Sequence, residues 1–318
     1  MLSRTANDLY WMARYMERAE NVARMLDVTH RMSLLPYPSS EHPNAAEELW
    51  RVPLVVTGLE EQFNLRYAAP SAETVLRYML FDTENPSSVI SAIQVARENG
   101  RAQRGALSAE MWECLNGTWL DMRQQSHQNI LAQGVSRFLE RVKTRSQLFR
   151  GITYGTMLRD EGYGFIRIAT FLERADNTAR ILDVKYHTLL PSAEAVGGAV
   201  DYYQWSALLR SVGAFESYRK IYRDVILPRR VTELLILRAD VPCSLRTCMA
   251  SLHEIIEAMM QGNVLAEVER LAGRMHSELR YARVESIIET GLHDWIETFL
   301  AQTSELHVEL NQRFFAPN

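Results

Sequence analysis

The sequence predicts an all-α protein made of two tandem, homologous multi-helix bundles. One observation is helical periodicity along most of the chain, without alternating runs typical of strands. The other is a repeat: residues 17–28 read Glu-Arg-Ala-Glu-Asn-Val-Ala-Arg-Met-Leu-Asp-Val, and residues 173–184 match nine of these twelve positions at an offset of 156. We therefore expect a first repeat over 1–156 and a second over 157–318. A pseudo-twofold axis is expected to relate them within one compact body.

The agreement between the two halves extends beyond this segment. Pro86 recurs as Pro242 at the same offset, and residues 134–140 align with 291–297 at an offset of 157. The change of offset from 156 to 157 indicates that one residue was inserted in the second half, which leaves the order of the expected helices unchanged. Corresponding helices of the two halves are expected to superpose.

The first helix is expected over residues 3–33, where apolar residues recur with the helical period. Three prolines within residues 36–44 predict a loop, because proline breaks a helix and restricts the residue before it. A second helix is expected over 45–67. Pro70 and Ser71 then open a third helix that runs to about Phe81.

The remaining helices of the first half follow the turn 82–86. Asn85 is expected to cap the next helix and Pro86 to occupy its first position, because these residue types favour those places. This helix is expected to continue through Arg104, and two more helices are predicted over 109–125 and 131–156. The second half should repeat this order after the charged turn 159–162, where Asp160 or Glu161 complements the dipole of the following helix.

The repeated segment places polar residues on one face of its helix. At about 100° per residue, Glu17, Asn21 and Arg24 gather opposite the apolar face that carries Ala19 and Val22. The second copy carries the same residue types at the equivalent positions: Glu173, Asn177 and Arg180.

Three interpretations of this polar face stay open. In the first, it is a solvated helix surface on which Glu20 pairs with Arg24, and Asp176 with Arg180, at the favourable spacing of four residues. Exposed pairs of this kind stabilise a helix by only about 0.3–0.5 kcal/mol, which is a weak reason to keep the pattern in both copies.

In the second interpretation, the two polar faces meet across the pseudo-twofold, so that Glu17 pairs with Arg180 and Glu173 with Arg24. Buried ion pairs need further hydrogen-bonding partners, which Asn21 and Asn177 could supply.

In the third interpretation, the polar faces line a ligand cleft. Glu17 and Glu173 would then act as paired carboxylates for acid–base catalysis, or bind an amine. Arginine side chains bind carboxylates through two parallel hydrogen bonds, so a peptide or an amino acid would suit this set of residues. The candidate ligand-binding residues are Arg18, Asn21, Arg24, Arg174, Asn177 and Arg180.

Other kinds of site lack their usual sequence features. Glu289, His293 and Glu297 have helical spacing, but Ser136 replaces the histidine in the first half, so no metal site is predicted. Walker and Gly-x-Gly-x-x-Gly loops are absent from the sequence, and no cofactor is predicted. The net charge of −4, from 35 basic and 39 acidic residues, offers no basic surface for nucleic acid.

The protein is expected to be soluble and cytoplasmic. Its three cysteines have no Cys-x-x-Cys spacing and form an odd set, which suits a reducing compartment. Charged residues from Arg4 onward argue against a signal peptide, and no apolar run reaches membrane-spanning length.

Four stretches carry a resemblance to a known family. They are Met-Leu-Ser-Arg over 1–4, Tyr-Trp-Met-Ala-Arg-Tyr-Met-Glu-Arg-Ala-Glu-Asn-Val-Ala-Arg over 10–24, Arg-Asp-Glu-Gly over 159–162 and Phe-Leu-Glu-Arg-Ala-Asp-Asn-Thr-Ala-Arg over 171–180. Along essentially its entire length, the chain resembles the bacterial alpha-E domain family. The resemblance implies an all-helical domain with a prominent glutamate, which maps to Glu17 and Glu173.

The resemblance also implies a functional context. Members of the family look like genomic neighbours or fusion partners of circularly permuted ATP-grasp ligases and transglutaminase-like peptidases. We therefore expect an accessory protein, or one that binds a peptide or an amino acid, that acts with an ATP-grasp amide ligase in peptide synthesis or modification. The alternatives are an enzyme in its own right that uses Glu17 and Glu173 on peptide or amide bonds, and a structural scaffold whose polar faces only join the halves.

Overall fold

The computed structural model confirms that the protein is all-α in the part of the chain that it describes. Residues 1–34, 45–188, 199–259 and 267–315 form helices and turns and contain no strand. The proline-rich loop predicted over 36–44 lies outside these described residues. Within them, no helix combines the length and the apolarity that spanning a membrane requires.

The chain divides into two units, which are described separately. The N-terminal unit comprises Tyr15–Met157, and the C-terminal unit combines Met1–Arg14 with Leu158–Asn318. The long helix α1 (Ser3–Ser33) therefore contributes its first residues to one unit and the rest to the other. The sequence places residues 1–14 in the first repeat, whereas in the structure they pack with the second half of the chain.

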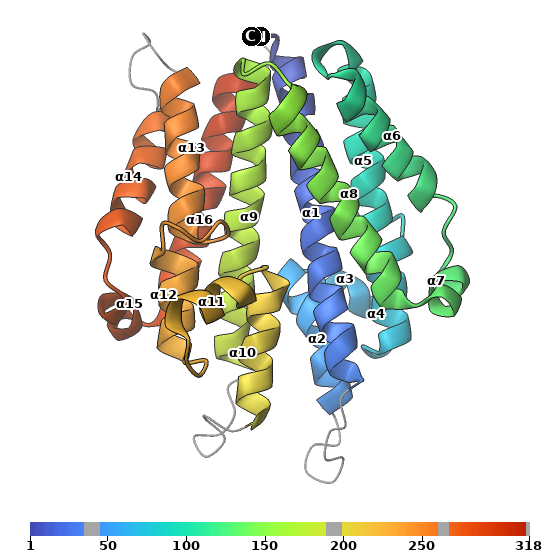
Figure 1. Ribbon diagram of the computed structural model, residues 1–318, viewed down its shortest axis with the longest axis vertical. Helices are drawn as coiled ribbons and strands as arrows, with labels where there is room; N and C mark the ends of the chain where they lie inside the picture. Colours follow the sequence, from blue (N-terminus) through green and yellow to red (C-terminus); the bar gives the residue numbers. More distant parts are fainter. Residues whose placement is uncertain (35–44, 189–198, 260–266, 316–318) are drawn as a thin grey trace. The chain divides into compact units, whose positions relative to one another are not determined.

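The remaining helices follow in the same order in both units (Figure 1). After α1, the N-terminal unit contains α2 (Ala45–Thr57), α3 (Glu60–Asn64), α4 (Ala72–Phe81), α5 (Val89–Ala102), the short 3-10 turn η1 (Arg104–Ala106), α6 (Ala109–Met122), α7 (His127–Gln133) and α8 (Val135–Thr156). The C-terminal unit contains α9 (Glu161–Thr188), α10 (Ala199–Ser211), α11 (Phe215–Tyr222), α12 (Pro228–Leu237), α13 (Leu245–Met259), α14 (Glu267–Tyr281), α15 (Val284–Thr290), α16 (Leu292–Leu310) and the π-helical turn η2 (Asn311–Phe315).

Each unit has its own apolar core. In the N-terminal unit the core joins α1, α2, α3, α4 and α8 through side chains with no exposed surface: Leu26, Leu54, Phe63, Met79 and Leu139. In the C-terminal unit, α13 and α16 pack along α9. Its fully buried side chains include Leu9, Ile168, Leu209, Leu252 and Ile296. Because each such side chain contributes about 1.5–3 kcal/mol when buried, these contacts are the main stabilising contribution in each unit.

Two long helices predicted from the sequence are each divided by a glycine. The helix predicted over 45–67 ends at Gly58, whose φ of 67° lies in the left-handed region, and α3 begins afterwards. The helix predicted over 131–156 is interrupted at Gly134, where φ is 97°, and becomes α7 and α8. A positive φ cannot continue an α-helix, so the chain changes direction at both points.

The capping prediction at Asn85 and Pro86 is wrong, because α5 begins three residues later. Ser88 is the N-cap, and its Oγ accepts a hydrogen bond from the backbone N–H of Ser91 at 3.2 Å. The buried Asn85 instead holds the preceding turn, since its side chain accepts from the Ser87 N–H at 2.9 Å and donates to the Tyr78 carbonyl at 3.2 Å.

The acidic turn before α9 behaves as predicted. The carboxylate of Asp160 accepts a hydrogen bond from the Tyr163 N–H at 3.1 Å, which satisfies one of the free N–H groups at the start of α9. Glu161 lies in the first turn, and its carboxylate pairs with the N-terminal amino group of Met1 at 2.6 Å.

The glycine turns have the same backbone conformation in both units. Gly213, between α10 and α11, has a φ of 73°, close to the 67° of Gly58 between α2 and α3. Gly291, between α15 and α16, has a φ of 98° and a ψ of 116°, close to the 97° and 122° of Gly134 between α7 and α8.

Replacement of Gly134 by alanine tests the role of this turn. We expect Gly134→Ala to lower the free energy of unfolding by about 1–2 kcal/mol, because a Cβ disfavours a positive φ even in open space. The matched control is Gly117→Ala inside α6, where an added Cβ also meets nothing within 4 Å. That variant should leave the stability unchanged or raise it, as measured by urea unfolding, and equal losses in both variants would contradict the argument.

Candidate functional site

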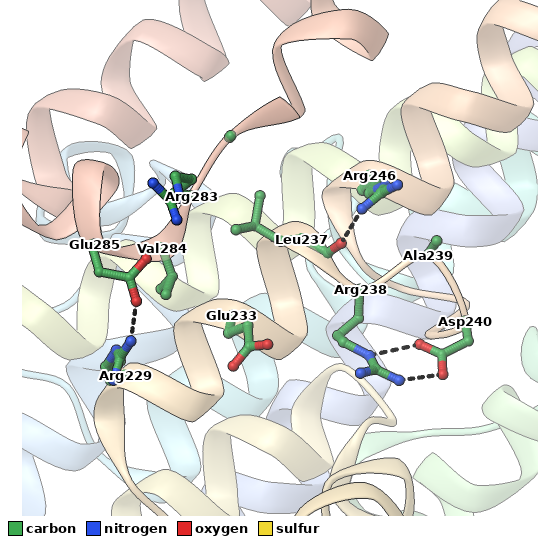
Figure 2. A pocket seen from close by; sticks show the side chains of 11 residues that line it. Arg229, Glu233, Leu237, Arg238, Ala239, Asp240, Arg246, Arg283, Val284 and Glu285 are labelled. Carbon is green, nitrogen blue, oxygen red and sulfur yellow. Dashed lines mark hydrogen bonds and ion pairs between the residues drawn. The ribbon is translucent and has the colours of Figure 1, made fainter. Parts of the chain in front are cut away.

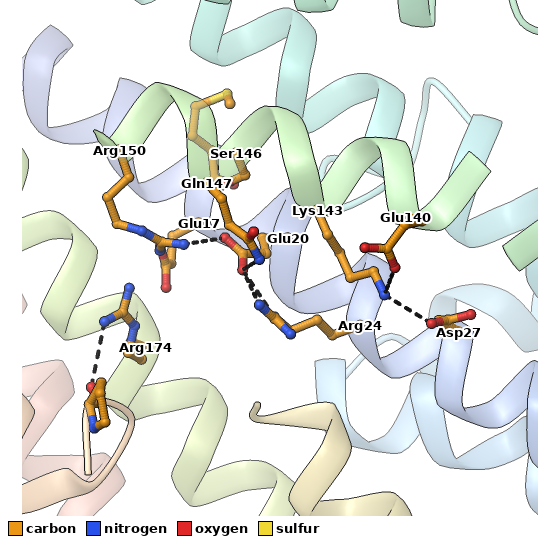
Figure 3. Close-up of polar contacts among 12 residues, drawn as sticks. Glu17, Glu20, Arg24, Asp27, Glu140, Lys143, Ser146, Gln147, Arg150 and Arg174 are labelled. Carbon is orange, nitrogen blue, oxygen red and sulfur yellow. Dashed lines mark hydrogen bonds and ion pairs between the residues drawn. The ribbon is translucent and has the colours of Figure 1, made fainter. Parts of the chain in front are cut away.

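The polar face of α1 packs against α8 within the N-terminal unit (Figure 3). Glu17 and Glu20 are only 5% and 3% exposed. Arg150 of α8 joins them, since its Nη1 donates to Glu17 Oε2 at 2.5 Å and its Nη2 donates to Glu20 Oε2 at 2.7 Å. Close by, the Ser146 hydroxyl donates to the Met16 carbonyl at 3.1 Å, which fixes the spacing of the two helices. One guanidinium group thus links two buried carboxylates.

Glu20 has the most partners in this network. Its Oε1 accepts hydrogen bonds from Arg24 Nε at 3.0 Å, Arg24 Nη2 at 2.6 Å and Gln147 Nε2 at 3.3 Å. Burial opposes its charge, but the charges of Arg150 and Arg24 outweigh burial and hold the pKa of Glu20 below its usual value. The predicted pairing of Glu20 with Arg24 is confirmed.

A third buried carboxylate, that of Asp27, follows two turns after Glu20 on α1. Lys143 Nζ of α8 contacts Asp27 Oδ2 at 2.9 Å and Glu140 Oε2 at 2.6 Å, and Arg31 Nε donates to Asp27 Oδ1 at 3.0 Å. Burial opposes the charge of Asp27, yet the hydrogen bonds from Arg31 and Lys143 lower its pKa. The polar face of α1 is therefore held to α8 at two places.

In the second copy of the motif, the glutamate has an arginine partner from a different helix. Glu173 of α9 is 6% exposed, and Arg14 of α1 lies 2.5 Å from its Oε2 through Nε. Arg14 Nη1 also donates to the Tyr10 hydroxyl at 3.1 Å, and that hydroxyl lies 2.8 Å from His307 Nδ1 on α16. Burial works against the charge of Arg14, but Glu173 and Tyr10 raise its pKa above the usual value.

The other predicted site residues have separate neighbours. The guanidinium of Arg18 stacks over the Tyr15 ring, 5.1 Å from its centroid. The buried side-chain nitrogen of Asn21 has no hydrogen-bond partner in the described structure. In the second copy, Arg174 donates to the Pro242 carbonyl at 3.5 Å, and Asn177 is half-buried.

The last arginine of the second copy pairs as predicted. Arg180 donates through Nε to Asp176 Oδ2 at 2.8 Å and through Nη2 to Asp176 Oδ1 at 3.2 Å. The predicted pairs of Glu17 with Arg180 and of Glu173 with Arg24 would join the two units, and they stay predictions. Within its own unit each motif glutamate has an arginine partner, Arg150 for Glu17 and Arg14 for Glu173.

The final aspartate of each copy binds the last long helix of its unit. Asp27 contacts α8 through Lys143, and its equivalent Asp183 contacts α16 through His293 Nδ1 at 2.7 Å. The Asp183 hydrogen bond raises the pKa of His293 above its ordinary value near 6.5. Among the described residues, no group of three or more side chains suited to hold a metal ion is present.

Sequence reasoning missed the arginine partners of the motif glutamates. Arg150 lies 130 residues from Glu20 along the chain, so no local pattern connects them. The repeat did contain one indication of these partners. At the offset of 157 that aligns the ends of the two repeats, Arg150 corresponds to another basic residue, His307. Both side chains belong to a polar network that reaches a motif glutamate.

Comparison with known protein families shows to which family the chain belongs. A family model described as "a predicted alpha-helical domain with a conserved ER motif" matches residues 1–315. The chain belongs to the Alpha-E family. A Glu-Arg pair opens each repeated segment of this Alpha-E chain, at Glu17-Arg18 and Glu173-Arg174.

Similar proteins occur in mycobacteria. An uncharacterised protein of Mycobacterium bovis and one of Mycobacterium tuberculosis strain CDC 1551 are each 25% identical to the Alpha-E chain over 310 residues, which is 90% of this chain and 33% of theirs. A protein of Mycobacterium tuberculosis strain H37Rv is 24% identical over the same share of each chain. The chain thus spans about a third of the length of these relatives. No solved structure matches it.

Removal of Arg150 tests the network. We expect Arg150→Ala to lower the free energy of unfolding by about 3 kcal/mol, because it leaves the buried carboxylates of Glu17 and Glu20 without a shared cation. The control is Arg137→Ala on the exposed side of α8, which should change stability by no more than about 0.5 kcal/mol. Equal effects of the two variants in urea unfolding would contradict the assignment.

The His293–Asp183 contact predicts a pH dependence. A raised pKa in the folded state means that this contact stabilises the fold fully below pH 6.5 and that its contribution is lost as the pH rises through the folded-state pKa. In an NMR titration, His293 should titrate above 6.5, and Asp183→Asn should return its pKa toward that value. His276 is an internal control, because burial and the neighbouring His253 lower its pKa. A His293 pKa that Asp183→Asn leaves unchanged would contradict this assignment.

Proposed function

We propose that this Alpha-E chain is a cytoplasmic helical module that acts with an ATP-grasp-type amide ligase in peptide synthesis or modification. The observation that carries the proposal is the length of the mycobacterial relatives, of which the chain matches only 33%. In those proteins the Alpha-E region is one part of a much longer polypeptide, as expected of a module that works beside other domains. A transglutaminase-like peptidase is a further proposed partner.

The contacts of the motif favour a supporting role over a catalytic one. A general acid or base must reach the proton that it transfers in the substrate. Glu17 and Glu173 are instead only 5% and 6% exposed, and each pairs with an arginine, Arg150 and Arg14. We propose that these pairs hold α1 and its neighbouring helices in place. An enzyme that uses Glu17 and Glu173 as acid and base is the alternative.

The proposed ligand of the motif region is a peptide or an amino acid. Arg18 and Arg174 are only half-buried, and each carries a guanidinium group that suits a carboxylate. Asn21 supports the proposal, since its buried side-chain nitrogen is without a hydrogen-bond partner in the described structure. Together with Arg24, Asn177 and Arg180 they form the proposed ligand-binding set.

We further propose that the two halves are tandem copies of one bundle. The matching φ angles of Gly58 and Gly213, and of Gly134 and Gly291, support this proposal, as does the shared order of the helices. The pseudo-twofold between the halves stays a prediction from the sequence. The proposed cytoplasmic location is supported by three cysteines that form no disulfide.

A binding and activity assay tests the proposed partnership. The purified chain and the ATP-grasp-type ligase of the same organism should bind with a Kd of about 1 μM or tighter, and together they should form more amide product than the ligase alone. Calorimetry gives the affinity, and mass spectrometry gives the product. If the two proteins neither bind nor change product formation, the proposal is wrong.

The same assay separates the alternatives through Glu17→Gln and Glu173→Gln. A catalytic role predicts that the chain alone hydrolyses or forms peptide bonds and that these variants abolish the activity while they remain folded. The supporting role predicts that the chain alone is inactive. It also predicts that each variant unfolds at lower urea concentration, because the partly buried arginine, Arg150 or Arg14, loses the charge of its partner.

A further inference from the structure

A cavity of about 580 Å³ lies within the C-terminal unit, away from the residues of the repeated motif. The end of α12, the turn that leads to α13 and the turn between α14 and α15 line it (Figure 2). Its volume falls within the range of about 300–1,000 Å³ that small-molecule sites occupy. The lining is rich in charged side chains, which gives the cavity a defined chemical preference.

Two ion pairs form opposite parts of the lining. Arg229 of α12 pairs with Glu285 of α15, and Arg238 forms two hydrogen bonds with Asp240, through Nε at 2.8 Å and through Nη2 at 2.5 Å. These four charges neutralise one another within the protein. We therefore expect the other charged residues of the lining to determine which ligand binds.

Three charged side chains of the lining form no direct ion pair among the described residues, although Arg283 lies near Glu285 and Glu233 near Arg238. Arg246 of α13 makes one hydrogen bond, from Nη1 to the Leu237 carbonyl at 3.2 Å, which leaves its charge uncompensated. Arg283, just before α15, makes no side-chain hydrogen bond or ion pair in the described structure. Glu233 of α12 forms no ion pair there and lies between the two neutral pairs in Figure 2.

We propose that this cavity binds a small zwitterion, namely a free α-amino acid. Two arginines match a carboxylate, which accepts two parallel hydrogen bonds from a guanidinium group. The carboxylate of Glu233 matches an ammonium group. A simple anion would meet the repulsion of Glu233, and a simple amine would meet that of Arg246 and Arg283. An amino acid carries both charges on one short frame and satisfies all three side chains.

The charge pattern of the cavity belongs to the C-terminal unit alone. At the offset of 156 residues, Glu233 corresponds to Arg77 and Arg246 to Ile90. The repeat therefore does not account for these residue types in the lining. The inference goes beyond the proposed function and needs no ligase, so amino-acid binding and ligase binding can succeed or fail independently.

The test is a binding screen of the full chain with the twenty unmodified amino acids, each at about 10 mM, followed by calorimetric titration of the tightest binder. We expect one or more to bind with a Kd of about 1 mM or tighter. The N-acetyl derivative of that amino acid lacks the ammonium group, and its amide lacks the carboxylate. Each should bind at least tenfold more weakly.

Variants locate the site. Arg283→Gln should weaken binding of the amino acid at least tenfold, and Glu233→Gln should remove the preference for the amino acid over its N-acetyl derivative. The control is Arg270→Gln on α14, an exposed arginine outside the cavity that pairs with Glu267, and it should bind as the natural protein does. Circular dichroism confirms that each variant is folded.

Three results would overturn the inference. The first is that none of the twenty amino acids binds at about 10 mM, which would leave the cavity without the proposed ligand. The second is that inorganic phosphate or the N-acetyl derivative binds as tightly as the amino acid, which would identify a general anion site. The third is that Arg283→Gln and Arg270→Gln bind the amino acid equally well, which would place the site elsewhere.

Discussion

Burial of negative charge beneath a neighbouring helix is the constraint on which the N-terminal unit depends. Glu17 and Glu20 lie one turn apart on α1 and are both almost completely buried, so the fold must supply positive charge at that place. Arg150 supplies it from α8, and Arg24 and Gln147 complete the hydrogen bonds of Glu20. Such a network fixes the register of the two helices, because a shift of either would leave a carboxylate buried without a cation.

In the C-terminal unit, the buried motif glutamate obtains its positive charge from a different helix. Glu173 of α9 pairs with Arg14, which lies in the first half of α1 and not on the last long helix of the unit. Arg14 also bonds Tyr10, whose hydroxyl reaches His307, and this explains why residues 1–14 pack with the second half of the chain. In both units the repeated glutamate thus pairs with an arginine of another helix, Arg150 of α8 for Glu17 and Arg14 of α1 for Glu173. In the cavity of the C-terminal unit, by contrast, Glu233, Arg246 and Arg283 form no direct ion pair among the described residues.

Local sequence patterns predicted the local features of the fold. The helix over 3–33, the acidic cap before α9 and the pairs Glu20–Arg24 and Asp176–Arg180 depend on residues within a few positions of one another, and the structure confirms them. The helix breaks at Gly58 and Gly134 were not predicted, because an isolated glycine is tolerated in many helices and its φ is set by tertiary packing. The contact between Arg150 and Glu17 could not be predicted from local sequence patterns, because it joins residues far apart in the chain.

A double-mutant cycle tests most directly whether the ion pair of the buried Glu17 with the partly buried Arg150 holds α1 to α8. The free energy of unfolding would be measured for Glu17→Gln, Arg150→Gln and the combined variant, with the exposed pair Glu98–Arg101 treated in the same way. The account predicts a coupling energy of about 2 kcal/mol or more for Glu17 with Arg150, and no more than about 0.5 kcal/mol for the exposed pair. A coupling energy for Glu17 and Arg150 as small as that of the exposed pair would contradict the account.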